Sequence, residues 1–253
     1  MTTDDRPSTS PLARTADLDR LLLWLGLLAA AGLVGAVAPL LGALADALIL
    51  VGFAVVARSK RPLGDAATAL MLVPLLRLLW VTILIEAVPQ ADRTLLVAVP
   101  YLVATFLIAR GLDVTPHEVG MGRPARPWVE VAIAAAIGAA GLAIGLLVGS
   151  EVHWATTASG FQVRAIGYAI VIAYAEELAF RGLMPKVLDR HVPGLGYALA
   201  AVAYAILALG AGSLLLAAIT IGLGIATTLA ARSTGSLWGV VAGHAAFLIL
   251  LNV

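Results

Sequence analysis

The sequence contains no cysteine and few charged residues. Only 12% of its 253 residues are Asp, Glu, Lys or Arg, about half the share found in a typical soluble domain. The absence of cysteine excludes disulfides, thiolate nucleophiles and thiolate metal sites. The net charge of +1 gives nucleic acid no strong electrostatic attraction. The chain is instead 61% hydrophobic with a mean hydropathy of +1.01, which indicates an integral membrane protein.

Apolar runs separated by charged or Gly/Pro-rich breaks predict nine helices. Several are shorter than the ~20 residues of a perpendicular span, and the breaks around Pro39 and Gly210 are the weakest. We therefore expect an all-α fold, a polytopic membrane helix bundle with about eight or nine transmembrane helices. The predicted helices are 21–37, 40–57, 66–85, 94–109, 128–149, 164–184, 195–209, 212–231 and 236–253.

The positive charges predict the orientation of this bundle. When the N-terminus is placed in the cytoplasm, thirteen of the 16 Lys and Arg residues fall on the inner side and only Arg93 and Arg164 on the outer side. Cytoplasmic loops of membrane proteins carry such an excess of positive charge. We therefore expect a cytoplasmic N-terminus and an outer C-terminus. The asymmetry also supports the helix count, because the loss of one span would invert everything that follows.

Four segments follow from this division. Residues 1–20 are polar and are expected to be a disordered cytoplasmic tail. Residues 21–110 form N-terminal transmembrane helices, 111–127 a cytoplasmic loop, and 128–253 a transmembrane core. The first apolar run could be mistaken for a signal peptide, but Pro39 directly after a candidate cleavage site argues against cleavage.

The cytoplasmic loop carries helix-capping residues. Thr115 and Glu118 have the spacing of a capping box, and Pro116 occupies the first helical position. Gly120 is a suitable helix stop. The sequence therefore predicts a short helix along the cytoplasmic face.

Two further patterns predict contacts between helices. Asp46 and Arg77 lie at the same depth on neighbouring spans, about 16 Å from the inner end of each, and intramembrane charges usually form pairs. A structural ion pair is favoured over a proton or ion pathway. Gly141, Gly145 and Gly149 form a small-residue stripe that lets helices approach closely. Packing within the monomer is favoured there over a dimer interface.

The most costly polar group in the membrane is the cluster Glu176, Glu177 and Arg181. Glu177 and Arg181 are four residues apart and share a helix face, so they can pair. Glu176 points about 100° away and lacks that partner. Glu176 is therefore the candidate general base.

His244 is the only histidine inside a predicted span; the others, His117, His153 and His191, fall in predicted loops. It lies at the depth of Glu176, about 12 Å from the inner end of its helix, so the two side chains can face a common cavity. A buried structural hydrogen bond is the alternative. Two carboxylates and one histidine are too few ligands for a catalytic zinc site, and we expect no cofactor and no metal.

These residues resemble the CAAX-protease and bacteriocin-processing (CPBP or Abi) family of intramembrane proteases. The sequence Glu-Glu-Leu-Ala-Phe-Arg-Gly at 176–182 matches its first motif. The run 234–238 followed by His244 resembles the approach to its last motif, and 118–121 resembles a short segment that precedes the core. The resemblance covers about 115–244.

The resemblance implies an all-helical protease, in a bacterial cytoplasmic membrane, that cuts prenylated or other membrane-associated peptides. It also implies a role for each site residue. Glu176 would activate water, Glu177 and Arg181 would support it, and His244 would help to stabilise the oxyanion.

Two departures from the family pattern bear on activity. Ala208 stands where the second motif, Phe-x-x-x-His, has histidine, and Leu248 stands where the last motif has Asn or Asp. Asn252 lies one turn too far to substitute for it. Three functions stay open: an intramembrane endopeptidase, a catalytically silent protein that binds membrane peptides or a partner, and, less favoured, a transporter. The substrate and the oligomeric state do not follow from the sequence.

Overall fold

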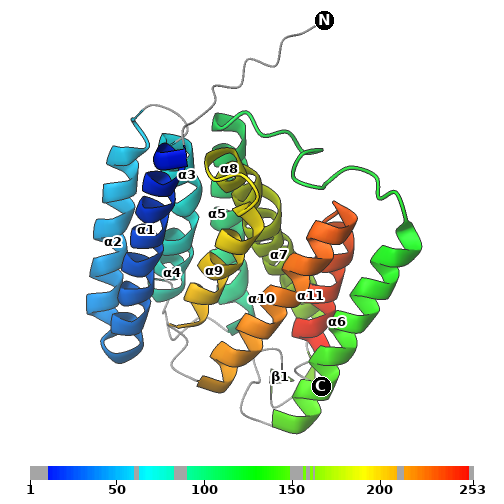
Figure 1. Ribbon diagram of the computed structural model, residues 1–253. Coiled ribbons are helices and arrows are strands. Elements are labelled where there is room, and N and C mark those ends of the chain that lie inside the picture. Colours follow the sequence, from blue (N-terminus) through cyan, green and yellow to red (C-terminus); the bar gives the residue numbers. More distant parts are fainter. Residues whose placement is uncertain are drawn as a thin grey trace, which may run out of the picture.

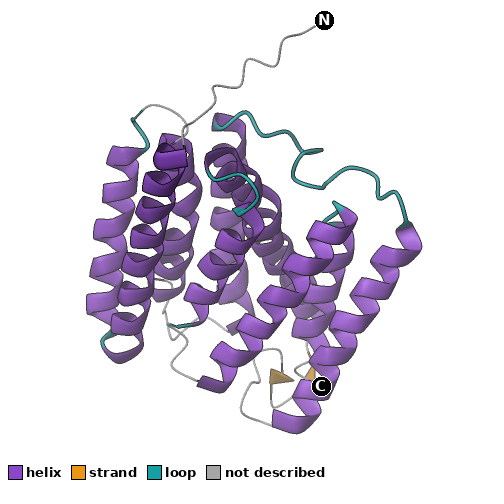
Figure 2. Ribbon diagram, in the orientation of Figure 1, coloured by secondary structure: helices purple, strands orange, loops and turns teal. Residues whose placement is uncertain are grey.

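The computed structural model of the chain is a bundle of helices with one two-residue hairpin (Figure 1, Figure 2). It describes residues 11–59, 63–82, 90–148, 156–157, 160–161, 163–209 and 214–250. The hairpin pairs β1 (Thr156–Thr157) with β2 (Gly160–Phe161) in antiparallel register. The predicted all-helical class is therefore confirmed. Of the loop residues singled out above, His153 falls outside the described part of the chain.

Each of the nine predicted helices has a counterpart in the structure. The N-terminal half contains α1 (Pro11–Val37), α2 (Pro39–Val56), α3 (Leu63–Leu70), α4 (Leu72–Thr82), α5 (Gln90–Gly111) and α6 (Pro127–Val148). The C-terminal half contains α7 (Val163–Glu177), the π-helix η2 (Leu178–Leu183), α8 (Met184–His191), α9 (Gly196–Ala208), α10 (Leu214–Thr234) and α11 (Trp238–Leu250).

Three boundaries differ from the prediction. Helix α1 begins at Pro11, so residues 11–20 are helical and not a disordered tail. The third predicted helix is interrupted at Met71, because Pro74 has no N–H for the carbonyl of Leu70 and its ring crowds that carbonyl. The sixth predicted helix continues through η2 into α8, which ends at His191.

The helices have the apolar surface of an integral membrane protein. Five segments are long and apolar enough to cross a membrane, namely 17–37, 39–56, 63–82, 92–111 and 127–147, and α9 and α11 are shorter apolar helices. Large apolar side chains on the outer helices are widely exposed, including Leu40 at 83% and Leu147 at 84%. Such surface is compatible with a lipid environment. The full count of eight or nine spans and the orientation stay predictions.

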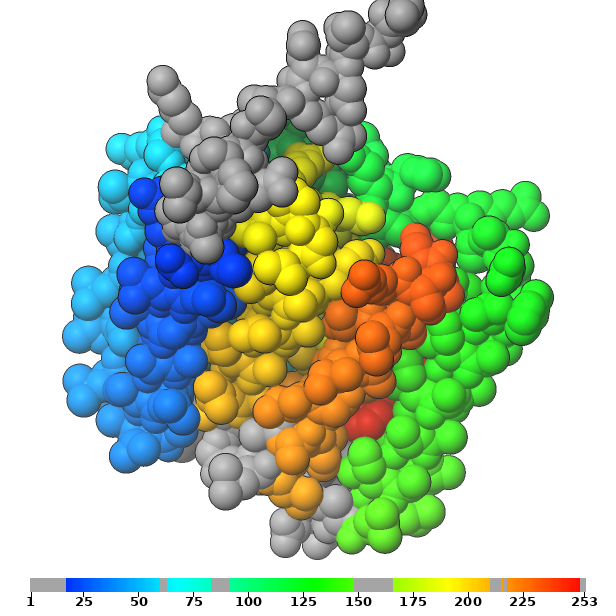
Figure 3. Space-filling view, viewed as in Figure 1, coloured from blue at the N-terminus to red at the C-terminus, as the bar shows by residue number. Residues whose placement is uncertain are grey.

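The two ends of the bundle differ in what they carry. The start of α1, the loop between α5 and α6, and α8 lie at one end, whereas α11 runs to the opposite end (Figure 1). Helix α10 lies across the bundle between α9 and the pair formed by α11 and α6 (Figure 3). Helices α7, α9, α10 and α11 therefore surround one interior region.

The predicted ion pair between Asp46 and Arg77 is present. One guanidinium nitrogen of Arg77 donates to Asp46, and the other donates to the carbonyl of Leu28, 2.9 Å away. Both charged residues are buried. A Cβ at Gly32 would lie 2.5 Å from Arg77 Nη1, so only glycine leaves room for the guanidinium there. The pair ties α1, α2 and α4 together.

Helices α6 and α11 pack closely, in part through the predicted glycine stripe. A Cβ added to Gly141 would lie 2.6 Å from the carbonyl oxygen of Phe247, so the backbones are in direct contact. This places Gly141 inside the monomer, as expected, while Gly149 lies outside the described residues. At the start of α11, Glu130 Oε2 accepts the Gly239 N–H at 2.6 Å. Glu130 thus caps the neighbouring helix.

The loop between α5 and α6 contains a single turn where a short helix was predicted. The capping box is present, because Glu118 Oε2 accepts the N–H and hydroxyl of Thr115 at 2.7 and 2.8 Å. These bonds, the backbone N–H first, lower the pKa of Glu118. Gly120, at φ +82°, donates its N–H to the carbonyl of His117 at 3.1 Å. The start and stop signals are so close that they close one turn between them.

Candidate functional site

The glutamate pair lies where the backbone changes from α to π geometry. Helix α7 ends at Glu177, and the next six residues form η2, which contains Arg181. Single π-turns are frequent at functional sites, because they re-aim side chains without ending the helix. No residue of this apolar stretch signals the π-turn in the sequence. All six residues of η2 are buried.

Glu177 and Arg181 form the ion pair that their spacing predicts. Arg181 Nε lies 3.3 Å from Glu177 Oε2, and both side chains are fully enclosed. Arg181 also donates to the carbonyl oxygen of Gly224 on α10 at 3.2 Å. A buried charge requires such partners. Glu177 and Arg181 are therefore placed to neutralise each other, and neither is open to solvent.

His244 contacts Glu177 and not Glu176. Its Nδ1 lies 2.8 Å from Glu177 Oε1, and His244 is 3% exposed. This contact sets the hydrogen-bonding pattern of the ring. In the neutral ring, Nδ1–H donates to Glu177 and Nε2 presents a lone pair. In the protonated ring, Nε2–H is a donor as well.

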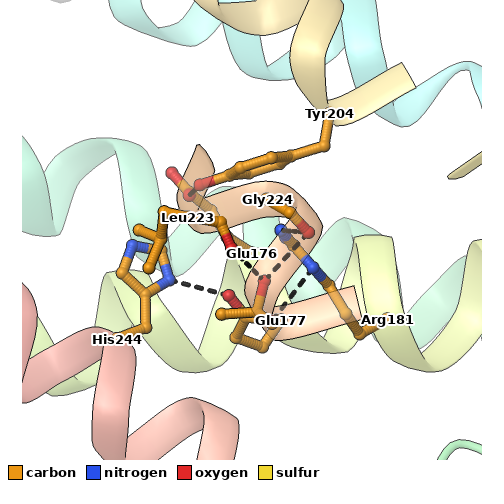
Figure 4. Close-up of polar contacts among 8 residues, drawn as sticks. Glu176, Glu177, Arg181, Tyr204, Leu223, Gly224 and His244 are labelled. Atoms are coloured by element: carbon orange, nitrogen blue, oxygen red, sulfur yellow. Dashed lines mark hydrogen bonds and ion pairs between the residues drawn. The ribbon is translucent and has the colours of Figure 1, made fainter. Parts of the chain in front are cut away.

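Glu176 has different surroundings from its neighbour. It is partly exposed, whereas Glu177 is 0% exposed. Its Oε2 accepts a hydrogen bond from the hydroxyl of Tyr204 on α9 at 3.1 Å. His244, Glu177 and Arg181 are close enough to act on it electrostatically. Figure 4 shows these side chains converging from α7, η2, α9 and α11.

Tyr204 is the central residue that the sequence reasoning missed. Besides its bond to Glu176, its ring lies 3.9 Å from the guanidinium carbon of Arg181 and makes an edge contact with Phe180. A Cβ at Gly224 would lie 2.7 Å from the ring, so glycine lets α10 approach it. An aromatic residue with a polar end inside an apolar run was the available signal.

A second tyrosine lies near the same group. Tyr101, on α5, is fully buried and interacts electrostatically with Glu176, Tyr204 and Arg181. Its hydroxyl has no hydrogen-bond partner among the residues that the structure describes. The site therefore also receives a side chain from the N-terminal half of the chain.

The remaining positions from the sequence reasoning lie as follows. Ala208 is buried at the end of α9, and Leu248 is half-buried in α11. His117 is in the α5–α6 loop, and His191 is buried at the end of α8 beside α1. Asn252 is outside the described residues.

The α5–α6 loop packs onto the site from one end of the bundle. A Cβ at Gly182 would lie 3.1 Å from Val119 and from Leu237, so the loop rests directly on η2. Gly120 accepts the Leu237 N–H at 3.0 Å, which fixes the loop to the start of α11. Beside this contact is a small pocket. It is lined by Glu118, Val119, Gly120, Arg181, Lys186, Tyr197, Ala231, Gly235, Ser236 and Leu237.

Metal-ligating side chains do not gather in the described part of the chain: no three His, Asp or Glu side chains there are arranged to hold an ion. Glu177 already forms an ion pair with Arg181 and a hydrogen bond with His244. The chemistry that these groups can offer is proton transfer by a carboxylate or an imidazole, together with hydrogen-bond donation from Tyr204 or His244.

Comparison with known proteins agrees with the resemblance seen in the sequence. The family model described as type II CAAX prenyl endopeptidase Rce1-like matches residues 158–250. This stretch includes Glu176, Glu177, Arg181, Tyr204 and His244, and the match confirms the similarity to the CPBP family there. The segment 118–121 lies outside it. No curated protein and no solved structure matches the chain.

Proposed function

We propose, from the match of residues 158–250 to type II CAAX prenyl endopeptidases, that this membrane protein is an intramembrane endopeptidase. Its substrates are membrane-associated peptides or proteins, and a glutamate activates the water that cuts them. The N-terminus faces the cytoplasm, the site lies in the cytoplasmic half of the bilayer, and the membrane is the bacterial cytoplasmic membrane.

The unequal environment of the two carboxylates is the observation that carries this proposal. Glu177 is 0% exposed and is engaged by Arg181 and His244. Glu176, the adjacent residue, is partly exposed, and Tyr204 is its one hydrogen-bond partner among the described side chains. A general base must be reachable by water and able to exchange protons. Of the pair, Glu176 fits that requirement.

The proposed reaction uses Glu176 twice. Its carboxylate takes a proton from water, and the hydroxide oxygen forms a bond to the carbonyl carbon of the substrate peptide. The resulting tetrahedral oxyanion collapses, the C–N bond breaks, and Glu176 returns the proton to the departing amine. The products are a carboxylic acid and an amine, which exchange a proton to become carboxylate and ammonium, and the enzyme is regenerated.

In this scheme His244 stabilises the negative charge that develops on the carbonyl oxygen of the substrate. Glu177 lies against its Nδ1 and orients the ring, so that in the protonated ring Nε2–H is the donor for the oxyanion. Arg181 balances the charge of Glu177. Loss of a single oxyanion donor typically lowers kcat by about 10²–10³-fold.

A catalytically silent, peptide-binding protein is the second candidate. It is favoured by Ala208 and Leu248, which place apolar side chains at two positions where the family pattern has polar ones. The network around Glu177 is then a structural device that ties η2 to α11. A transporter that uses the buried charges ranks third.

Purified protein in detergent, incubated with a library of membrane-associated peptides, separates these functions. We compare the wild type with Glu176→Gln, which keeps the shape of the side chain but cannot take up the proton. Asp19→Asn, on the exposed face of α1, is the matched control. The expected result is a fall in kcat of about 10²–10⁴-fold for Glu176→Gln and no change for Asp19→Asn.

Two outcomes would contradict the proposal. Turnover that survives Glu176→Gln would remove Glu176 as the base. A wild-type protein that binds peptides but cuts none would establish the silent function.

A further inference from the structure

We propose that Tyr204 is a positioning residue for Glu176, an inference that rests on the endopeptidase function proposed above. Its hydroxyl holds the Glu176 carboxylate, while its ring holds Arg181, the partner of Glu177. One side chain on α9 thereby couples the two carboxylates of the pair.

The position of Tyr204 is fixed from three sides. Phe180 of η2 makes an edge contact with its ring at a centroid distance of 5.1 Å. The guanidinium of Arg181 covers the ring face, which a cation favours. Gly224 of α10 presents only backbone to the ring. With its ring so held, Tyr204 directs its hydroxyl to one place, the Oε2 atom of Glu176.

The environment gives this bond a specific consequence. Among the described residues, the polar groups near Glu176 are Glu177 at the end of α7, Arg181 in η2, His244 on α11, Tyr204 on α9 and Tyr101 on α5. Glu177 and His244 are hydrogen-bonded to each other, and of these side chains only Tyr204 donates a hydrogen bond to Glu176. The remaining oxygen, Oε1, is the atom that this bond leaves available to a water molecule.

Tyr204 also accounts for how the site can act without a polar side chain at 208. Residues 204 and 208 are one turn apart on the same face of α9. Ala208 offers no hydrogen bond, but the hydroxyl of Tyr204 reaches the glutamate from the preceding turn. The donor is supplied from the same helix at a different residue.

Tyr204→Phe tests this role, because it removes the hydroxyl and keeps the ring contacts to Arg181 and Phe180. Tyr197→Phe, two turns away on α9 and packed near Lys186, is the matched control. A charged hydrogen bond is removed, so we expect kcat to fall about 10- to 100-fold with KM unchanged. The thermal midpoint in detergent should stay close to that of the wild type.

A second measurement does not depend on turnover. Dicyclohexylcarbodiimide, a hydrophobic reagent for carboxyl groups, is reacted with each variant and the modified residue is identified by mass spectrometry. Loss of the hydroxyl frees Oε2, so Glu176 should be labelled several-fold faster in Tyr204→Phe than in the wild type or Tyr197→Phe.

The two measurements separate this inference from the proposed function. If the wild type cuts no peptide, the endopeptidase function fails, while faster labelling still supports the Tyr204–Glu176 contact. If the wild type is active and Tyr204→Phe has the same kcat and the same labelling rate, the positioning role is overturned. A change in KM alone would likewise contradict it, because it would indicate a binding role.

Discussion

Replacement of Gly224 by alanine is the sharpest test of how the site is packed. The new Cβ would lie 2.7 Å from Tyr204 Cδ1, 3.2 Å from Cε1 and 3.4 Å from Arg181 Nη2. Carbon atoms in contact prefer about 3.5–4.0 Å, so the ring has to move by roughly 1 Å. The hydroxyl of Tyr204, now 3.1 Å from Glu176 Oε2, would then leave hydrogen-bonding distance.

The expected change in stability is a difference of two effects. Overpacking lowers the free energy of unfolding by about 1–3 kcal/mol. Alanine in place of glycine inside a helix raises it by about 0.8–1 kcal/mol. Gly224→Ala should therefore lower the free energy of unfolding by about 0–2 kcal/mol. Activity should respond more strongly, because a misplacement of about 1 Å can cost 10²-fold in rate.

Gly222 provides the control on the same helix. It is exposed, and no atom lies within 4 Å of the Cβ that alanine would add. Gly222→Ala should keep full activity and gain up to about 1 kcal/mol. The assay is peptide cleavage together with the thermal midpoint in detergent. Equal activity and equal stability of the two variants would refute the packing argument.

Two further variants test the buried charges. Arg181→Met leaves the enclosed carboxylate of Glu177 without its cation, which should lower the free energy of unfolding by about 3–5 kcal/mol. The double variant with Glu177→Met should recover most of the lost thermal stability. A double variant no more stable than the single one would count against the ion pair. Burial lowers the pKa of His191 below its usual value. The same histidine in the unfolded chain has a pKa of about 6.5 and therefore binds a proton more readily. The free energy of unfolding should then decrease as the pH falls below about 6.5. His191→Leu should reduce the drop in thermal midpoint between about pH 7.5 and pH 5; an unchanged drop would show that other groups cause it.

The contacts that the sequence predicts correctly are those that depend on spacing or depth alone. Glu177 and Arg181 pair because they are one turn apart, and Asp46 and Arg77 pair because they have equal depth on neighbouring helices. Both quantities follow directly from the rise of 1.5 Å per residue.

The contacts that the sequence missed depend on rotation about the helix axis. His244 has the depth of both glutamates, yet it bonds Glu177 and not Glu176. Which carboxylate meets α11 and which meets Tyr204 is decided by how α7, α9 and α11 are turned toward one another. Apolar residues surround these helices almost completely, so hydrophobic periodicity gives little information about that rotation.

The α5–α6 loop shows a different limit. Thr115, Glu118 and Gly120 make the local hydrogen bonds that their residue types predict. The length of the element was wrong, because the stop signal closes the turn before a helix can extend. Local chemistry was therefore predictable where the extent of the helix was not.

The π-turn at 178–183 makes the site sensitive to chain length as well as to residue type. A π-turn holds one residue more than an α-turn, so deletion of one residue from 178–180 would restore regular α geometry and place Arg181 three residues after Glu177. The distances from Arg181 to Glu177 and to the ring of Tyr204 would then change. Among variants of this chain, substitutions in η2 that keep the small and apolar character should be tolerated, whereas insertions and deletions there should not.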